Sequence, residues 1–123
     1  MPGLTSFVIQ QLRDVTVVTV NETALLDAIS IHRLGKTLNG LVDKRALKKI
    51  VLDFSSVKFL ASSALGMLLT LRKKATAIGG RVVICGIRPE LHKVFKITNL
   101  DKMFEFFDGE EEALNAFGVT TTG

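Results

Sequence analysis

The chain has 123 residues, of which 47% are hydrophobic, and a formal net charge of +4. A chain of this length and composition can bury a hydrophobic core without stabilisation by disulfides or metals. It is therefore predicted to form a single domain over residues 1–123, whose folded part spans about residues 6–118. No apolar stretch approaches the roughly 18 residues of a membrane-spanning helix, and the first six residues lack the pattern of a signal peptide, so we expect a soluble, cytoplasmic protein.

Metal and disulfide chemistry find no support in the sequence. Cys85 is the single cysteine, so no internal disulfide can form, and its place after the apolar run 82–84 predicts a buried small hydrophobic side chain. His32 and His92 lie far apart, and no cluster of Cys or His has the spacing of a metal site. We therefore predict no metal and no cofactor.

The charges are distributed unevenly along the chain. Residues 1–104 hold all 16 Lys and Arg against 7 acids, whereas residues 105–112 hold the other 5 acids. Most of the cations close predicted helices or open strands, and cations at helix C-termini complement the helix dipole. Because the chain has no Trp or Tyr to stack on bases, direct nucleic-acid binding is disfavoured.

An antiparallel hairpin opens the predicted fold. Residues 7–12 and 15–20 have the pattern of strands, with Arg13 and Asp14 as the turn between them. Ser30 is then predicted to cap a helix with one buried face, because apolar residues recur at intervals of three and four at Ile31, Leu34, Leu38 and Leu41.

The segment from Lys49 to Leu71 carries the most informative pattern. The apolar run 50–52 predicts a buried third strand at 49–54, and a helix follows from about Ser63 to Ile78, ended by Gly79 and Gly80. Two adjacent serines, Ser62 and Ser63, stand where this helix begins. One serine can cap the helix, and the same place suits a phosphate, because first-turn amides and the helix dipole both stabilise anions.

The remaining elements complete an α/β pattern. We expect a fourth strand at 81–85, a short helix with Pro89 at its first position, a fifth strand at 102–107, and a final helix capped by Asp108 with Glu110–Glu112 in its first turn. The tail from Gly118 to Thr122 is expected to be loose. Together these elements predict a mixed sheet of about five strands, mostly parallel after the antiparallel hairpin, with about four helices.

These residues resemble the STAS domain family, and within it the small stand-alone bacterial anti-sigma factor antagonists. Members typically have a buried strand ending in Asp and then an Asp-Ser-Ser/Thr-Gly-Leu-Gly loop that leads into a helix. Here the loop reads Ala61-Ser62-Ser63-Ala64-Leu65-Gly66, which departs from the family pattern at Ala61 and Ala64. The similarity extends to the Gly79-Gly80 turn and covers nearly the whole chain.

The resemblance implies a function that is switched by phosphate. The unphosphorylated protein would bind an anti-sigma factor that is itself a serine kinase, so that a sigma factor is released, and phosphorylation of the serine loop would end this binding. By position in the motif, Ser62 is the implied phosphorylation site and Ser63 the helix cap, with Ser63 as second choice for modification. The implied partner-binding residues are Asp27, Ser62, Ser63, Ala64, Leu65 and Met67.

Several alternatives remain open at this point. The apolar side chains in the first turns of the helix 63–78 are either exposed for a partner or buried on two sides. Asp27 is either a partner contact or a solvated turn residue or auxiliary cap. No phosphate loop or nucleophile elbow is present, so we do not expect an enzyme. The runner-up function is an unswitched STAS scaffold or sensor subunit of a larger assembly, and a nucleotide-binding module is a weaker third. The oligomeric state is left open.

Overall fold

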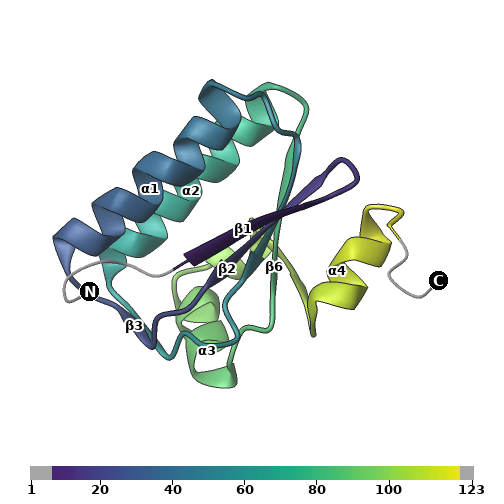
Figure 1. The fold of residues 1–123 in the computed structure, drawn as a ribbon. Helices are drawn as coiled ribbons and strands as arrows, with labels where there is room; N and C mark the ends of the chain where they lie inside the picture. The colour runs from purple at the N-terminus through teal and green to yellow at the C-terminus, as the bar shows by residue number, and fades with distance from the viewer. Residues whose placement is uncertain (1–6, 120–123) are drawn as a thin grey trace.

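A sheet with helices on both faces forms the centre of the molecule (Figure 1), as a computed structural model of residues 7–119 describes it. In chain order the elements are β1 (Phe7–Leu12), β2 (Val15–Val20), β3 (Ala24–Leu25), α1 (Ala28–Asp43), β4 (Lys49–Asp53), β5 (Phe59–Leu60), α2 (Ser62–Ala77), β6 (Arg81–Cys85), α3 (Pro89–Ile97), the short 3-10 helix η1 (Leu100–Lys102), β7 (Glu105–Phe107) and α4 (Glu110–Ala116).

The central sheet has five strands in the order β1-β2-β4-β6-β7. The hairpin β1-β2 is antiparallel, and every other neighbouring pair in this sheet is parallel. This topology confirms the predicted mixed sheet. The strands β3 and β5 form a separate parallel pair that the sequence did not predict, because two residues are too few to show a periodic pattern.

The inner strands are buried on both of their faces. In β4, Ile50 and Leu52 belong to the core beneath α1, α2 and α3, whereas Val51 lies in the smaller core beneath α4. Figure 1 shows α1 and α2 side by side over one face of the sheet and α4 on the opposite side. Burial on both faces is the reason that β2, β4 and β6 read as nearly continuous apolar runs in the sequence.

Cys85 ends β6 within the core beneath α4, where it is fully buried. Burial raises the pKa of its thiol to about 12, and the nearby carboxylates of Asp53 and Glu110 add to this effect. The prediction of a buried small hydrophobic residue at this position is confirmed.

Two glycines end α2, as the sequence predicted. Gly79 adopts a positive φ of 76°, its N–H donates to the carbonyl of Thr76 at 3.0 Å, and the N–H of Gly80 donates to the carbonyl of Ala75 at 2.7 Å. These bonds satisfy carbonyl groups that the end of a helix leaves open. A Cβ on Gly80 would lie 2.8 Å from the carbonyl oxygen of Lys48, so the chain can turn here only with glycine.

The C-terminal elements differ from the prediction in three respects. The fifth strand is only β7, because the residues before it form η1, and the N-cap of α4 is Gly109 rather than Asp108. The expected looseness is wrong at Gly118 and Val119, since the N–H of Val119 donates to the carbonyl of Leu114 at 2.9 Å and its side chain is buried. Thr120 to Thr122 lie outside the described residues.

A pair of carboxyl groups links α4 to the end of β4. Asp53 Oδ1 accepts a hydrogen bond from the N–H of Ser55 at 2.9 Å, and the hydroxyl of Thr19 donates to Glu110 Oε2 at 3.4 Å. Hydrogen bonding to Asp53, partial burial and charge repulsion raise the pKa of Glu110 to about 7. Burial acts to raise the pKa of Asp53, but the hydrogen bonds from Glu110 and Ser55 outweigh it and lower that pKa. Below a pH of about 7, the proton of this pair is therefore held by Glu110.

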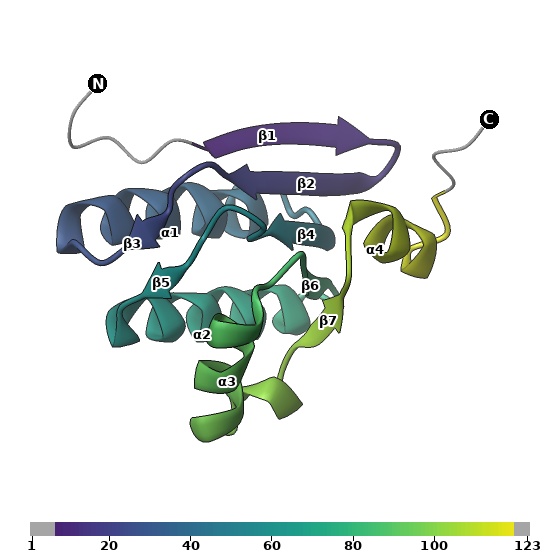
Figure 2. The same cartoon turned by 90° about the horizontal axis from the view of Figure 1, so that it is seen from below.

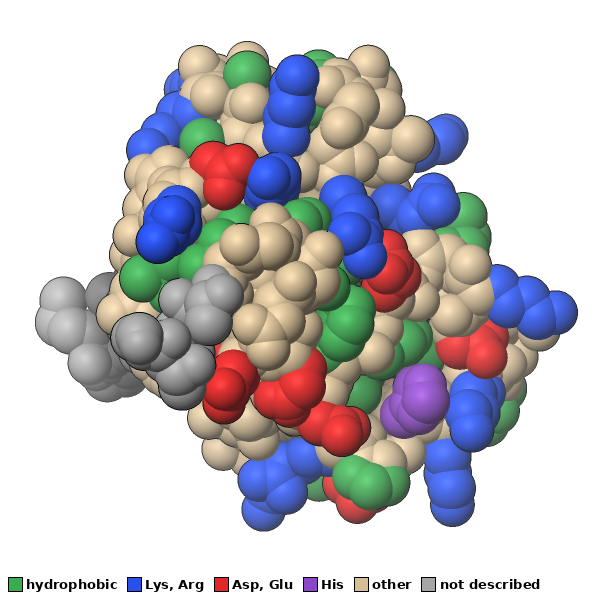
Figure 3. All heavy atoms as spheres, turned by 90° about the vertical axis from the view of Figure 1, so that its right-hand side faces the viewer, with side chains coloured by type: hydrophobic (Ala, Val, Ile, Leu, Met, Phe, Trp, Pro, Cys, Tyr) green, Lys and Arg blue, Asp and Glu red, His purple; other side chains and the backbone are tan. Residues whose placement is uncertain are grey.

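Glu110 is one of three glutamates, Glu110–Glu112, in the first turn of α4. Figure 3 shows the side of the molecule that bears α4, where acidic side chains gather in one group. Negative side chains in the first turn of a helix are stabilised by the helix dipole, so this group follows from the local chemistry of the helix start.

The Glu110 carboxyl makes a specific pH dependence testable. Its pKa is about 7 in the folded protein against an ordinary value of 4.5, so the folded state binds more protons in this window and the free energy of unfolding falls as pH rises through it. Glu110→Gln keeps a donor for Asp53 and removes the titration. We expect urea denaturation at several pH values to show a flatter pH dependence for this variant than for the wild type.

The matched control is Glu111→Gln, which changes an exposed neighbour in the same helix turn. This variant should follow the wild-type pH dependence. If Glu110→Gln follows it as well, the assigned proton does not belong to Glu110.

Candidate functional site

The starts of α1 and α2 lie beside each other at one end of the molecule. The segments that lead into them pair in parallel, with Ala24 opposite Phe59 and Leu25 opposite Leu60. The ladder continues to the helix itself, because the N–H of Ala61 donates to the carbonyl of Leu25 at 2.9 Å. Figure 2 shows β3 and β5 entering α1 and α2 from the same side. The positive ends of two helix dipoles therefore share one surface.

The two serines are the first two residues of α2, and both are exposed. The N-cap is Ala61, whose side chain cannot accept a hydrogen bond, so the prediction that Ser63 caps the helix is wrong. Among the described residues, neither serine hydroxyl has a hydrogen-bond partner. The start of α2 thus combines an uncapped set of amide donors with two free hydroxyls, a combination that favours an anion.

The start of α1, by contrast, carries its own negative charge. Asp27 is the N-cap, and its Oδ2 accepts a hydrogen bond from the N–H of Ser30 at 2.9 Å. This hydrogen bond lowers the pKa of the Asp27 carboxyl below its ordinary value. The sequence placed the cap at Ser30, which is instead a buried residue of the first turn. Asp27 is both a cap and an exposed residue beside the serines, so its two interpretations are compatible.

Exposed apolar side chains surround this pair of helix starts. Leu26 is 57% exposed, Ile29 is 65% exposed and Phe59 is 57% exposed, although all three are large hydrophobic residues. Leu26 and Ile29 flank the α1 cap, and Phe59 lies in β5. The exposure of these three residues was not predicted from the sequence. The available signal was that Ile29 falls outside the apolar spacing of α1, whose buried apolar positions begin with Ile31.

The structure revises the implied binding set on α2. Ala64 is 0% exposed and Leu65 is 6% exposed, so both belong to the core and cannot contact a partner directly. Their burial answers the open question about the first turns of this helix. Met67 is half-buried and lies against Gly35 of α1, where an added Cβ would come within 2.8 Å of its Cγ. Asp27, Ser62 and Ser63 are the members of the set that the surface presents.

Metal binding and membrane insertion find no support in residues 7–119. In that part of the chain, no three side chains of His, Cys, Asp or Glu come close enough together to hold a metal ion. None of its helices is sufficiently long and apolar to cross a membrane.

Comparison with known proteins places this geometry in a family. The STAS domain family matches residues 6–113. A curated relative, the anti-sigma F factor antagonist of Paenibacillus polymyxa, is 26% identical over 105 residues, which cover 85% of this chain and 90% of that protein.

Two solved structures share the fold. The crystal structure of an anti-sigma factor antagonist from Mycobacterium paratuberculosis matches with a TM-score of 0.82 at 24% identity, covering 97% of this chain and 98% of that one. The structure of the Bacillus cell fate determinant SpoIIAA in its phosphorylated form matches with a TM-score of 0.72 at 22% identity. The match covers 91% of this chain and 99% of that one.

The chain belongs to the STAS domain family. Anti-sigma factor antagonists of this family are regulatory proteins without enzymatic activity, so the prediction that the chain is not an enzyme is confirmed. At these levels of identity, the solved structures show the common fold alone.

The missing cap on α2 leads to a stability prediction. Ala61 has the extended backbone of an N-cap, with φ −76° and ψ 157°, so Ala61→Ser should place an acceptor beside the amide of Ser63; the amide of Ala64 already donates to the carbonyl of Ala61 at 2.9 Å. Capping of this kind is worth about 1 kcal/mol. We expect a higher urea midpoint for Ala61→Ser at unchanged m value. Ala61→Val, which adds bulk without an acceptor, is the control, and an equal gain for both variants would exclude capping as the cause.

Proposed function

We propose that the protein is an anti-sigma factor antagonist that docks through the surface around the starts of α1 and α2. The observation that carries this proposal is the presence of two free hydroxyls on an uncapped helix start, beside a second helix start and three exposed apolar side chains. The name of the Paenibacillus polymyxa relative supports the same role. The partner that we propose is an anti-sigma factor with serine kinase activity, in the cytoplasm.

Docking in the unphosphorylated state draws its free energy from the apolar residues. Leu26, Ile29 and Phe59 are each more than half exposed, so a partner that covers them removes apolar surface from water. Full burial of such a side chain is worth about 1.5–3 kcal/mol, before the costs of association are subtracted. The serine hydroxyls and the Asp27 carboxylate are exposed near these apolar residues and can make directed hydrogen bonds to the partner.

Phosphorylation of Ser62 is the switch in this proposal. A phosphate adds roughly −1.5 to −2 charges near neutral pH, and burying it under a docked partner requires its desolvation beside the carboxylate of Asp27. Within the free domain, the same phosphate is stabilised by the open amides and the dipole of α2. The modification therefore weakens binding while the fold stays intact.

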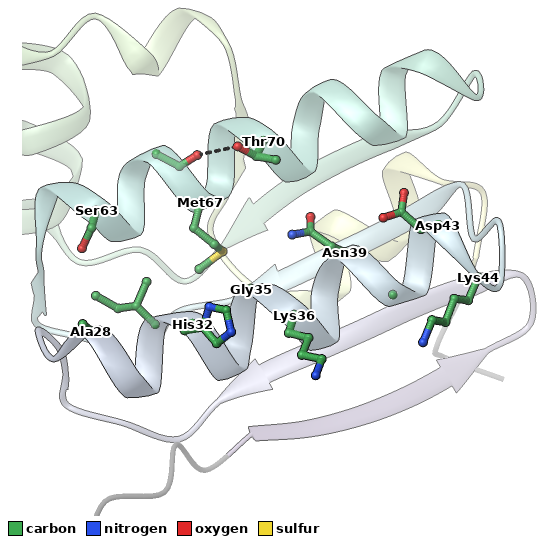
Figure 4. Close-up of a pocket in the computed structure, with 13 residues that line it drawn as sticks. Ala28, His32, Gly35, Lys36, Asn39, Asp43, Lys44, Ser63, Met67 and Thr70 are labelled. Atoms are coloured by element: carbon green, nitrogen blue, oxygen red, sulfur yellow. Dashed lines mark hydrogen bonds between the residues drawn. The ribbon is translucent and has the colours of Figure 1, made fainter.

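The structure supports Ser62 as the preferred site over Ser63. The side chain of Ser63 lines the groove between α1 and α2, and in Figure 4 its hydroxyl points from α2 toward α1. Ser62 is exposed and directly follows the ladder that joins β3 to β5 and Ala61. Ser62 is therefore accessible to a kinase, and it follows the exposed Phe59 by three residues.

The site assignment is tested with the cognate kinase and ATP. Ser62→Ala should abolish the mass increase of one phosphate that intact mass spectrometry detects in the wild type, and Ser63→Ala should retain it. Modification that persists in Ser62→Ala and is lost in Ser63→Ala would move the site to Ser63.

Partner retention tests the switch itself. Immobilised wild-type protein should retain a histidine-kinase-like ATPase that immobilised Ser62→Asp does not. Retention of the same large assembly by both proteins would favour an unswitched scaffold instead.

The apolar part of the surface is tested by a separate substitution. Phe59→Ala removes an exposed ring next to the serine loop, and we expect the affinity for the anti-sigma factor, measured by isothermal titration calorimetry, to fall by about tenfold or more. Ile97→Ala on α3 is the matched control, because Ile97 is 81% exposed but lies on another element. Equal losses for the two variants would contradict the assigned docking surface.

A further inference from the structure

An open groove runs between α1 and α2, away from the sheet, and only its Ser63 end belongs to the docking surface proposed above. It has a volume of about 720 Å³ and extends from Ser63 at the helix starts to Lys44 at the other end of α1. Figure 4 shows Asn39 and Asp43 of α1 pointing toward α2, while Met67 reaches down from α2 toward Gly35. Gly35 and Met67, which lie against each other, thus form part of the floor.

Glycines give the groove its width. Gly35 lets α1 and α2 approach, because an added Cβ there would lie 2.8 Å from Met67 Cγ. Gly40 of α1 and Gly66 of α2 also line the groove, but an added Cβ at either would meet no atom within 4 Å. Glycine is unfavourable inside a helix by roughly 0.5–1 kcal/mol relative to alanine. These two glycines are therefore not explained by packing within the domain, and they leave room for something that lies in the groove.

The charged side chains along the groove are mainly cationic. Lys36 and Lys44 line it from α1, and neither forms an ion pair with a residue among 7–119. On the other side, exposed Lys73 lines the hollow that adjoins the groove across α2. The acid of the groove, Asp43, is neutralised by Lys74, whose Nζ lies 2.6 Å from Asp43 Oδ2. An occupant that packs on Met67 and the glycines and places negative charges beside Lys36 and Lys44 would therefore match the groove.

We propose that the groove binds an acidic amphipathic α-helix of another protein. Both walls are helices of 16 residues, about 24 Å at 1.5 Å per residue, and a straight, open groove between parallel helices suits a third helix packed against both. An apolar stripe contacts Met67 and the glycines, and flanking carboxylates meet Lys36, Lys44 and Lys73.

A second copy of this chain does not meet these requirements with its described residues. Its acidic helix, α4, has seven residues, and its apolar side chains Ala113 and Leu114 are buried against the sheet. Small hydrophobic ligands are normally enclosed on most sides, whereas this groove is open along its length. The helix of a different protein is the occupant that agrees with both the shape and the charge.

The test uses a synthetic probe with a fixed chemistry. The probe is a labelled peptide of about 18 residues with leucines at helical spacing and glutamates on both flanks of the stripe. A twin peptide carries lysine in place of every glutamate. Fluorescence anisotropy should show saturable binding of the acidic peptide to the wild-type protein, with affinity at least about tenfold higher than for the basic twin. In NMR spectra the amide signals of Gly40 and Gly66 should shift, and that of Gly109 should not.

Matched variants connect binding to the groove. Gly40→Leu fills open space and improves helix propensity, so it should fold while weakening acidic-peptide binding by more than about tenfold. Ala77→Leu, at an exposed position of α2 outside the groove, should bind like the wild type. Lys36→Glu should weaken binding by roughly fivefold, and Arg33→Glu, which makes the same charge change elsewhere on α1, should not.

Three results would overturn the proposal. They are equal affinity for the acidic and basic peptides, unchanged binding by Gly40→Leu, and saturable binding of dodecanoate in the absence of any peptide binding. Because Gly40 lies at the opposite end of the groove from the serines, phosphorylation of Ser62 should be the same in Gly40→Leu and the wild type. The two proposals can therefore fail separately.

Discussion

The parallel arrangement of α1 and α2 is the constraint on which both proposed surfaces depend. Each helix connects one parallel strand to the next, and connections of this kind are almost always right-handed, so neighbouring helices run in the same direction over the same face. Both helices consequently begin at one end. The short ladder between β3 and β5 then fixes the two starts against each other, with Ala61 bonded to Leu25.

The two helix starts are chemically different although they are neighbours. The carboxylate of Asp27 already places a negative charge at the positive end of the α1 dipole. The N-cap of α2 is Ala61, which has no side-chain acceptor. An added negative charge is therefore accommodated best on α2, where the serines are. The same geometry sets the length of the groove between the helices, so the proposed phosphorylation site and the proposed peptide-binding groove lie on one continuous surface.

The sequence predicted the architecture well because the spacing of apolar residues indicates strands and helices, and glycines indicate where helices end. Strand β6 and the end of α2 at Gly79 were predicted with the correct bounds or nearly so. The helix starts were predicted less accurately, since Asp27 and Ser30 both suit a cap and only the backbone conformation decides between them. Ala64 and Leu65 were implied as contacts by a sequence motif, which does not reveal the direction of a side chain. The position of Phe59 beside the two helix starts depends on the pairing of β3 with β5, which are far apart in the sequence, so it could not be predicted from a local pattern.

The burial of Cys85 has a practical consequence. The chain has one sulfhydryl, it is 0% exposed, and its pKa near 12 keeps it in the unreactive thiol form at neutral pH. Alkylating reagents can therefore reach it only when the sheet opens, so its rate of labelling reports the opening free energy of the core. The native protein thus contains an intrinsic reporter of unfolding, and a second cysteine engineered on the surface would be labelled selectively.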